Sequence, residues 1–164
     1  MTHKLHRLTV LAMAVSLAVI LSYVEHLVPI SASVPGIKAG FANIAVIFVL
    51  YRIGVPEAVA VSVVRILIVA LLFGSAVSLI YSLSGAVVSF LVMLALKHLN
   101  FHSTLGVSVA GGVAHNAGQI GAACVVMGST QIAYYLPVLI ITGTIAGIFV
   151  GLISSLLVQR VPIR

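Results

Sequence analysis

Residues 56–74 read PEAVAVSVVRILIVALLFG, an apolar run that carries one cation, Arg65, near its middle. At about 1.5 Å per helical residue, this run is close to the length that a transmembrane helix needs. Arg65 then lies on the order of 13 Å from either end, which is too deep for its guanidinium group to reach water fully. We therefore predict a membrane-spanning helix and, inside the protein, a polar environment that receives Arg65.

Composition extends the membrane prediction to the whole chain. Hydrophobic residues make up 62% of the sequence and charged residues 6%, with a mean hydropathy of +1.33, which excludes an ordinary soluble domain. The net charge of +6 does not indicate a nucleic-acid partner, because the cations mostly flank apolar runs. Cys124 is the single cysteine and lies in an apolar segment, so we expect a core residue and no disulfide framework.

Six apolar segments follow one another along the chain, at about 8–28, 39–51, 56–73, 76–96, 104–127 and 132–158. The second has about 13 residues and covers about 20 Å as a helix, against about 30 Å of hydrocarbon, so we expect a short, broken or partly re-entrant element. Gly74 and Ser75 mark a tight turn between the third and fourth segments. The sequence predicts an all-α integral membrane protein with six transmembrane helices in a single domain over residues 1–164.

The basic residues between these segments predict an orientation. With six spans, one side of the membrane receives Lys4, Arg7, Arg52, Lys97, Arg160 and Arg164, and the other receives Lys38. The positive-inside rule then places both termini in the cytoplasm. The alternative that the start is a secretory signal is disfavoured, because the first apolar segment is longer than a typical signal core.

Polar side chains within the predicted helices indicate a binding pocket. His115, Asn116 and Gln119 fall within an arc of about 100° on one helix. Arg65 and His115 lie near the midplane and form the predicted floor. The other predicted site residues are Gln119, Asn43 and Tyr81 in the outer half, and Glu25, His26 and Lys38 at the outer mouth. Because cationic and neutral groups predominate, an anionic or hydrogen-bonding ligand fits best, although each residue could instead only bond a neighbouring helix.

Small residues at four-residue spacing form rows that let helices approach closely in lipid. The rows are Ala14 and Ala18; Ala110, Ala114, Gly118 and Ala122; and Gly143, Gly147, Gly151 and Ser155. We expect the second and third rows to serve packing within the chain. For Ala14 and Ala18, contact with a partner protein is the competing interpretation.

Three stretches, VPGIKAGFANI (34–44), YSLSG (81–85) and VAHNAGQ (113–119), together with the Arg65 helix, resemble the bacterial Gx transporter or heptaprenyl diphosphate synthase component I family. That family is similar to the S components of energy-coupling factor (ECF) transporters. The resemblance implies a six-helix protein of the bacterial cytoplasmic membrane whose site faces outward under the loop joining helices one and two. It also implies a transmembrane coupling subunit, docked through an Ala-x-x-x-Ala motif that Ala14 and Ala18 match, and separate ATPase subunits.

The residues do not match a prenyl diphosphate synthase, although the family's name suggests one. Such enzymes hold magnesium with aspartate-rich motifs, whereas this chain has no aspartate, and Glu25 and Glu57 are predicted on opposite membrane faces. We therefore expect no enzyme activity, no metal and no cofactor. A phosphate-binding loop of the P-loop type is also missing from the sequence, so a partner must supply energy for transport.

The sequence thus favours a substrate-binding subunit of an ECF-type transporter that takes up a small anionic, isoprenoid-like or vitamin-like solute. Two alternatives stay open. One is a non-catalytic membrane accessory of heptaprenyl diphosphate or isoprenoid-quinone synthesis, with a soluble prenyl synthase as its partner. The other is a structural subunit of a membrane redox complex.

Overall fold

A computed structural model of the chain describes residues 2–27, 40–99 and 103–161, and within this part every regular element is helical. The elements are α1 (Thr2–Leu27), α2 (Asn43–Arg52), α3 (Val55–Phe73), α4 (Ala76–His98), α5 (Thr104–Met127), the 3-10 helix η1 (Thr130–Tyr135) and α6 (Leu136–Arg160). Each of the six predicted apolar segments coincides with one α-helix. The predicted all-α fold class is confirmed.

Four of the helices, α1, α3, α4 and α6, are long and apolar enough to cross a membrane. Their uncovered faces carry large apolar side chains such as Leu71, Leu91 and Ile141, which suits contact with lipid. Helix α5 is equally long, with 24 residues, but His115, Asn116 and Gln119 make it more polar. The structure therefore supports a multi-pass membrane protein. Helix α5 differs from the four apolar helices because its polar side chains need polar partners inside the protein.

Helix boundaries follow local residue chemistry. Ser75 accepts a hydrogen bond from the backbone N–H of Ser78 at 3.2 Å and so begins α4 directly after α3 ends. A β-carbon at Gly74 would lie 2.8 Å from the α-carbon of Ala70, so only glycine fits this tight turn. Pro56 lies in the first turn of α3, where its missing N–H costs no helical hydrogen bond.

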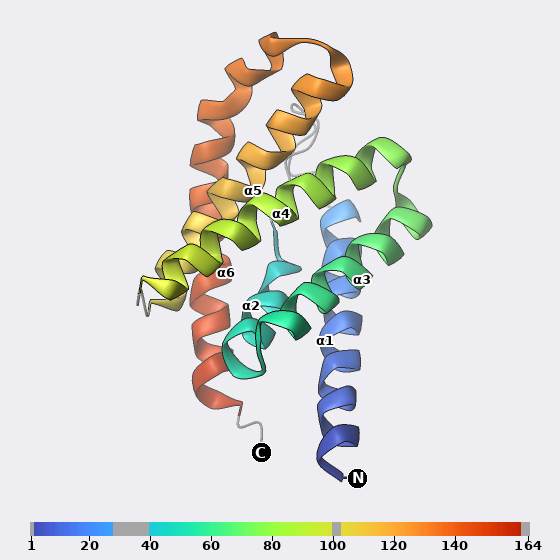
Figure 1. Cartoon of the computed structure of the whole chain (residues 1–164), viewed down its shortest axis with the longest axis vertical. Helices are drawn as coiled ribbons and strands as arrows, with labels where there is room; N and C mark the ends of the chain where they lie inside the picture. The colour runs from blue at the N-terminus through green and yellow to red at the C-terminus, as the bar shows by residue number, and fades with distance from the viewer. Residues whose placement is uncertain (1, 28–39, 100–102, 162–164) are drawn as a thin grey trace.

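The helices form two groups that α2 connects (Figure 1). Helix α5 packs extensively against both α4 and α6, while α1 and α3 pack against each other. Helix α2 contacts α1, α3 and α6. In Figure 1, α3 and α4 cross α1 and α6 obliquely, and the start of α1 lies at the same end of the molecule as the end of α6.

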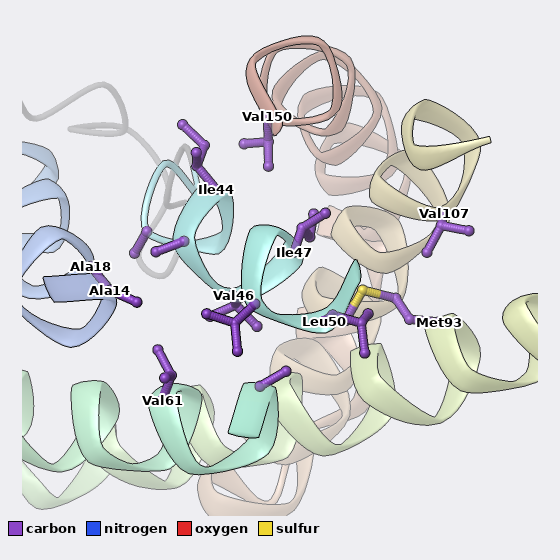
Figure 2. Packing of buried hydrophobic residues seen from close by; sticks show 14 residues of the cluster. Ala14, Ala18, Ile44, Val46, Ile47, Leu50, Val61, Met93, Val107 and Val150 are labelled. Atoms are coloured by element: carbon purple, nitrogen blue, oxygen red, sulfur yellow. The ribbon is translucent and has the colours of Figure 1, made fainter. Parts of the chain in front are cut away.

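Helix α2 has 10 residues, about 15 Å, and forms the centre of the hydrophobic core. Val46, Val49 and Leu50 are at most 2% exposed. Figure 2 shows side chains from other helices around α2, including Val61 of α3 and Val150 of α6. The predicted short second helix is confirmed, and because protein surrounds it, it does not have to match the thickness of the hydrocarbon core by itself.

The Ala14–Ala18 row of α1 belongs to the same core. The two side chains are 6% and 0% exposed and point toward α2 and α3 (Figure 2). Met13, Leu17 and Ile20 lie on the uncovered side of α1 instead. In this conformation, therefore, the pair packs within the chain, and its predicted contact with a partner stays a prediction.

The row on α6 lies against α5, as expected. A β-carbon on Gly147 would come within 2.6 Å of the α-carbon of Val109, and one on Gly143 would lie 2.8 Å from Asn116 Nδ2. The missing side chains allow the two backbones to approach closely. The packing role predicted for this row is confirmed.

Basic residues meet at one end of the helices. Arg7 of α1 forms an ion pair with Glu57 of α3. Arg52 donates from Nε to the carbonyl of Val161 at 3.2 Å, and Lys97 donates from Nζ to the carbonyl of Leu50 at 3.1 Å. These contacts join the start of α1, the α2–α3 junction and the ends of α4 and α6, which were predicted to lie on the same side of the membrane. Lys38 and Arg164 lie outside the described residues.

Candidate functional site

Arg65 lies halfway along α3 with its Nε atom buried and, among the described residues, without a hydrogen-bond partner. The Glu25 carboxylate at the end of α1 is close enough to interact electrostatically with it. Glu25 also accepts a hydrogen bond from the backbone N–H of Phe41, directly before α2. The acid therefore links α1 to the start of α2 and offsets the buried cation of α3.

This arrangement differs from the predicted layout of the site. Glu25 was expected at the outer mouth and Arg65 on the floor, as separate parts of one pocket. The two charges attract each other at a distance, because α1 and α3 pack against each other. Glu25 therefore weakens the attraction that Arg65 would exert on an anion.

A small cavity lies between α2 and the α4–α6 group, with about 30 Å³ open to the centres of water-sized molecules. This is room for about two water molecules. Five helices and the residue Gly40 before α2 surround it. The described lining residues are Gly40, Asn43, Val46, Ile47, Ser62, Ala86, Ser89, Phe90, Met93, Ser108, Gly111, Gly112, His115, Asn116, Gly143, Ala146, Gly147 and Val150.

Two of the polar lining residues form hydrogen bonds between helices. Asn116 is 4% exposed and donates from Nδ2 to the carbonyl of Leu139 on α6 at 2.8 Å. Ser89 of α4 donates to the carbonyl of Gly111 on α5 at 2.8 Å. Asn116 therefore holds α5 and α6 together while it also borders the cavity.

Of the predicted site residues, the structure brings Asn43, His115 and Asn116 together around this cavity. Gln119 is buried one turn further along α5, where a β-carbon on Gly85 of α4 would lie 2.9 Å from its Cγ atom. Gln119 is not among the residues that line the cavity.

The other predicted residues lie away from it. Arg65, Tyr81 and Glu25 do not line the cavity. His26 stacks on Phe73 with 5.9 Å between ring centroids, so it packs α1 against the end of α3. Lys38 lies outside the described residues.

Sequence reasoning missed three serines that line the cavity, namely Ser62, Ser89 and Ser108. One signal was available. Ser108 precedes His115 by seven residues, which returns to nearly the same direction on a helix of 3.6 residues per turn. The polar face of α5 could therefore have been extended two turns toward its start.

The cavity presents neutral hydrogen-bonding groups. Among its described lining residues there is no lysine, arginine, aspartate or glutamate, and His115 is the one titratable side chain. Within the described residues, no group of three His, Cys, Asp or Glu side chains could hold a metal ion. The site is suited to binding through hydrogen bonds and apolar contact.

Comparison with known families agrees with these features. The family described as heptaprenyl diphosphate synthase component I matches residues 14–157, which include every helix except the start of α1 and the end of α6. The chain belongs to this family. The family predicted from the sequence motifs is thereby confirmed, and the match covers both the α2 core and the cavity. No curated protein and no solved structure matches this component I chain.

Proposed function

We propose that this protein is the membrane-embedded substrate-binding subunit of an ECF-type transporter. The observation that carries the proposal is the cavity inside the bundle, where Asn43, His115 and Asn116 meet although they come from different parts of the chain. Polar groups are costly within a membrane protein unless they bond to each other or to a ligand. A solute that supplies hydrogen bonds gives these groups a function beyond helix packing.

The present cavity is small, so uptake of a vitamin-sized or isoprenoid-like solute requires the helices around it to separate. The packing supports such a movement, because the α1–α3 pair and the α4–α6 group are joined mainly through α2 and the α3–α4 contact, whereas packing within the α4–α6 group is far more extensive. A coupling subunit with separate ATPases would drive it. The proposal assigns no docking role to Ala14 and Ala18, since both are buried in the core.

The family description favours a second candidate, a membrane accessory of prenyl diphosphate synthesis. In this role the chain would hold a soluble prenyl synthase, or its lipid product, at the membrane. The chain itself offers no aspartate to bind magnesium and diphosphate, so the chemistry would belong to the partner.

Native mass spectrometry on the protein extracted gently from its own membranes separates the candidates. The transporter proposal predicts a discrete bound small molecule and co-purifying ATPase subunits. A prenyl synthase without ATPase subunits would support the accessory role. A protein that carries neither a small molecule nor ATPase subunits in its native membrane contradicts the transporter proposal.

A pair of variants tests whether the bound molecule lies in the cavity. His115→Leu removes a polar lining group and is expected to reduce the occupancy of the bound mass at least tenfold. Thr144→Val is the control, because Thr144 lies on α6 outside the lining and bonds to the carbonyl of Ile140 in its own helix. Equal occupancy in the two variants would place the bound molecule elsewhere.

A further inference from the structure

Ser108 differs from helical hydroxyl groups that bond within their own helix. It is 3% exposed, and its Oγ has no hydrogen-bond partner among the described residues. Ser16 and Thr144, in contrast, donate to a carbonyl of their own preceding turn at 2.9 and 2.8 Å. This local bond is the usual solution for a hydroxyl in an apolar helix. A buried hydroxyl that forgoes it requires another partner.

Ser154 of α6 is the residue with which Ser108 is best compared. Its Oγ is also buried and, within the described part of the chain, without a partner. Only Ser108 lines the cavity, however, whereas Ser154 does not. Ser108 therefore borders a space that a partner from outside the chain can enter, and its covered Oγ becomes reachable when the helices around the cavity separate, as the proposed binding function requires.

The surroundings of Ser108 define the chemistry of that partner. The described lining of the cavity contains no lysine, arginine, aspartate or glutamate, and His115 is its one titratable side chain. Arg65 and Glu25 lie outside the lining. Burying an uncompensated charge costs far more than burying a neutral group that is hydrogen-bonded. A hydroxyl, carbonyl or amide is therefore favoured over a phosphate or a carboxylate.

We propose that Ser108 is a specificity-determining contact at the end of the cavity nearest the start of α5, and that it binds an uncharged hydrogen-bonding group of the solute. This inference rests on the proposed binding function and narrows the substrate class. The first expectation was an anion-binding floor around Arg65. The present inference proposes a subsite for an uncharged group instead. A solute that also carries a charge would hold that charge outside this part of the cavity.

Cysteine labelling tests the proposal without knowledge of the solute. Ser108→Cys and the control Ser154→Cys are made in a Cys124→Ala background and treated, in proteoliposomes, with methanethiosulfonate reagents. The reagents carry a neutral methyl, an anionic sulfonatoethyl or a cationic trimethylammonium-ethyl group. Rates are divided by those for free mercaptoethanol. The neutral reagent is expected to modify position 108 at least tenfold faster than position 154, and both charged reagents at least tenfold more slowly than the neutral one.

Two outcomes would overturn the proposal. Equal neutral rates at positions 108 and 154 would show that the cavity gives no access to Ser108. An anionic rate at position 108 matching the neutral rate would show that the subsite accepts anions. If Ser108→Cys does not fold, Ser62→Cys reports on the same cavity from α3. Loss of the bound mass in native mass spectrometry concerns the proposed function alone, so the two failures are distinguishable.

Discussion

Arg65 shows how a single residue constrains a membrane bundle. Its position in α3 predicts that something must compensate a buried cation, but local sequence cannot identify the group. Glu25 lies on α1 and comes within electrostatic range of Arg65 because the two helices pack together. This attraction favours the packing of α1 against α3, and Glu25 also accepts a hydrogen bond from the Phe41 N–H just before α2.

Removing one member of this pair is expected to be more harmful than removing both charges. Arg65→Leu leaves the Glu25 carboxylate uncompensated and should destabilise the protein by about 3 kcal/mol. The double variant Arg65→Leu with Glu25→Gln removes both charges and retains an acceptor for the Phe41 N–H. We expect it to recover most of the loss. Thermal unfolding in mild detergent, followed with a fluorogenic maleimide at the single Cys124, measures both variants.

The test depends on the difference in unfolding temperature between the two variants. If the double variant unfolds at the same temperature as Arg65→Leu, the two charges do not stabilise each other. If Arg65→Leu is as stable as the unmodified protein, loss of the guanidinium group does not leave Glu25 uncompensated. The predicted interaction between the two charges would then be wrong.

Helical periodicity predicted part of the site and could not predict the rest. It correctly directed His115 and Asn116 of α5 toward one face, which borders the cavity. Gln119 points to nearly the same side one turn later, but α4 covers it at Gly85. Periodicity gives the direction of a side chain around its own helix. Where along that helix the neighbours leave space depends on how the helices cross.

Among the elements, α5 and α6 illustrate how small residues determine packing. The order, type and approximate limits of all six α-helices follow from hydropathy and turn residues. The role of a small-residue row does not, because spacing alone cannot tell which helix faces it. The α6 row packs against α5, and Ala14 and Ala18 pack into the α2 core.

A methyl group on Gly147 tests this close contact. Gly147→Ala places a carbon 2.6 Å from the α-carbon of Val109, so α5 and α6 must separate. We expect a loss of about 1–3 kcal/mol, as for other overpacked sites. Gly121→Ala on α5 is the matched control, because nothing lies within 4 Å of its added carbon and alanine favours the helix. In thermal unfolding experiments in detergent, Gly147→Ala should have a lower midpoint temperature than the unmodified protein, and Gly121→Ala should not. Equal midpoint temperatures for the two variants would contradict the close contact between α5 and α6.

At the scale of the whole molecule, charge and topology agree. The start of α1 and the end of α6 lie at the same end of the molecule (Figure 1), and Arg7 and Arg52 make their contacts there, while Lys97 bonds to the end of α2. With the six crossings expected from the sequence, both ends would lie on one side of the membrane. The positive-inside rule predicts that this side is the cytoplasm.

Reporter fusions check this orientation. Alkaline phosphatase, which needs disulfides formed outside the cytoplasm, is expected to be active after Gly74 or Gly128 and inactive after Gly54. A fluorescent protein at the C-terminus is expected to fluoresce in the cytoplasm. An inactive phosphatase at Gly128 together with an active one at Gly54 would reverse the orientation.

The burial of α2 has a consequence for biosynthesis. Its side chains suit the membrane interior, but at about 15 Å it cannot reach both surfaces, so its backbone ends would meet hydrocarbon if it inserted by itself. Its protein surroundings include α6, which follows every other described helix in chain order. We therefore expect α2 to stay near the membrane interface until α6 has been synthesised. A chain truncated before Leu136 is expected to lose not only α6 but also the stable membrane insertion of α2.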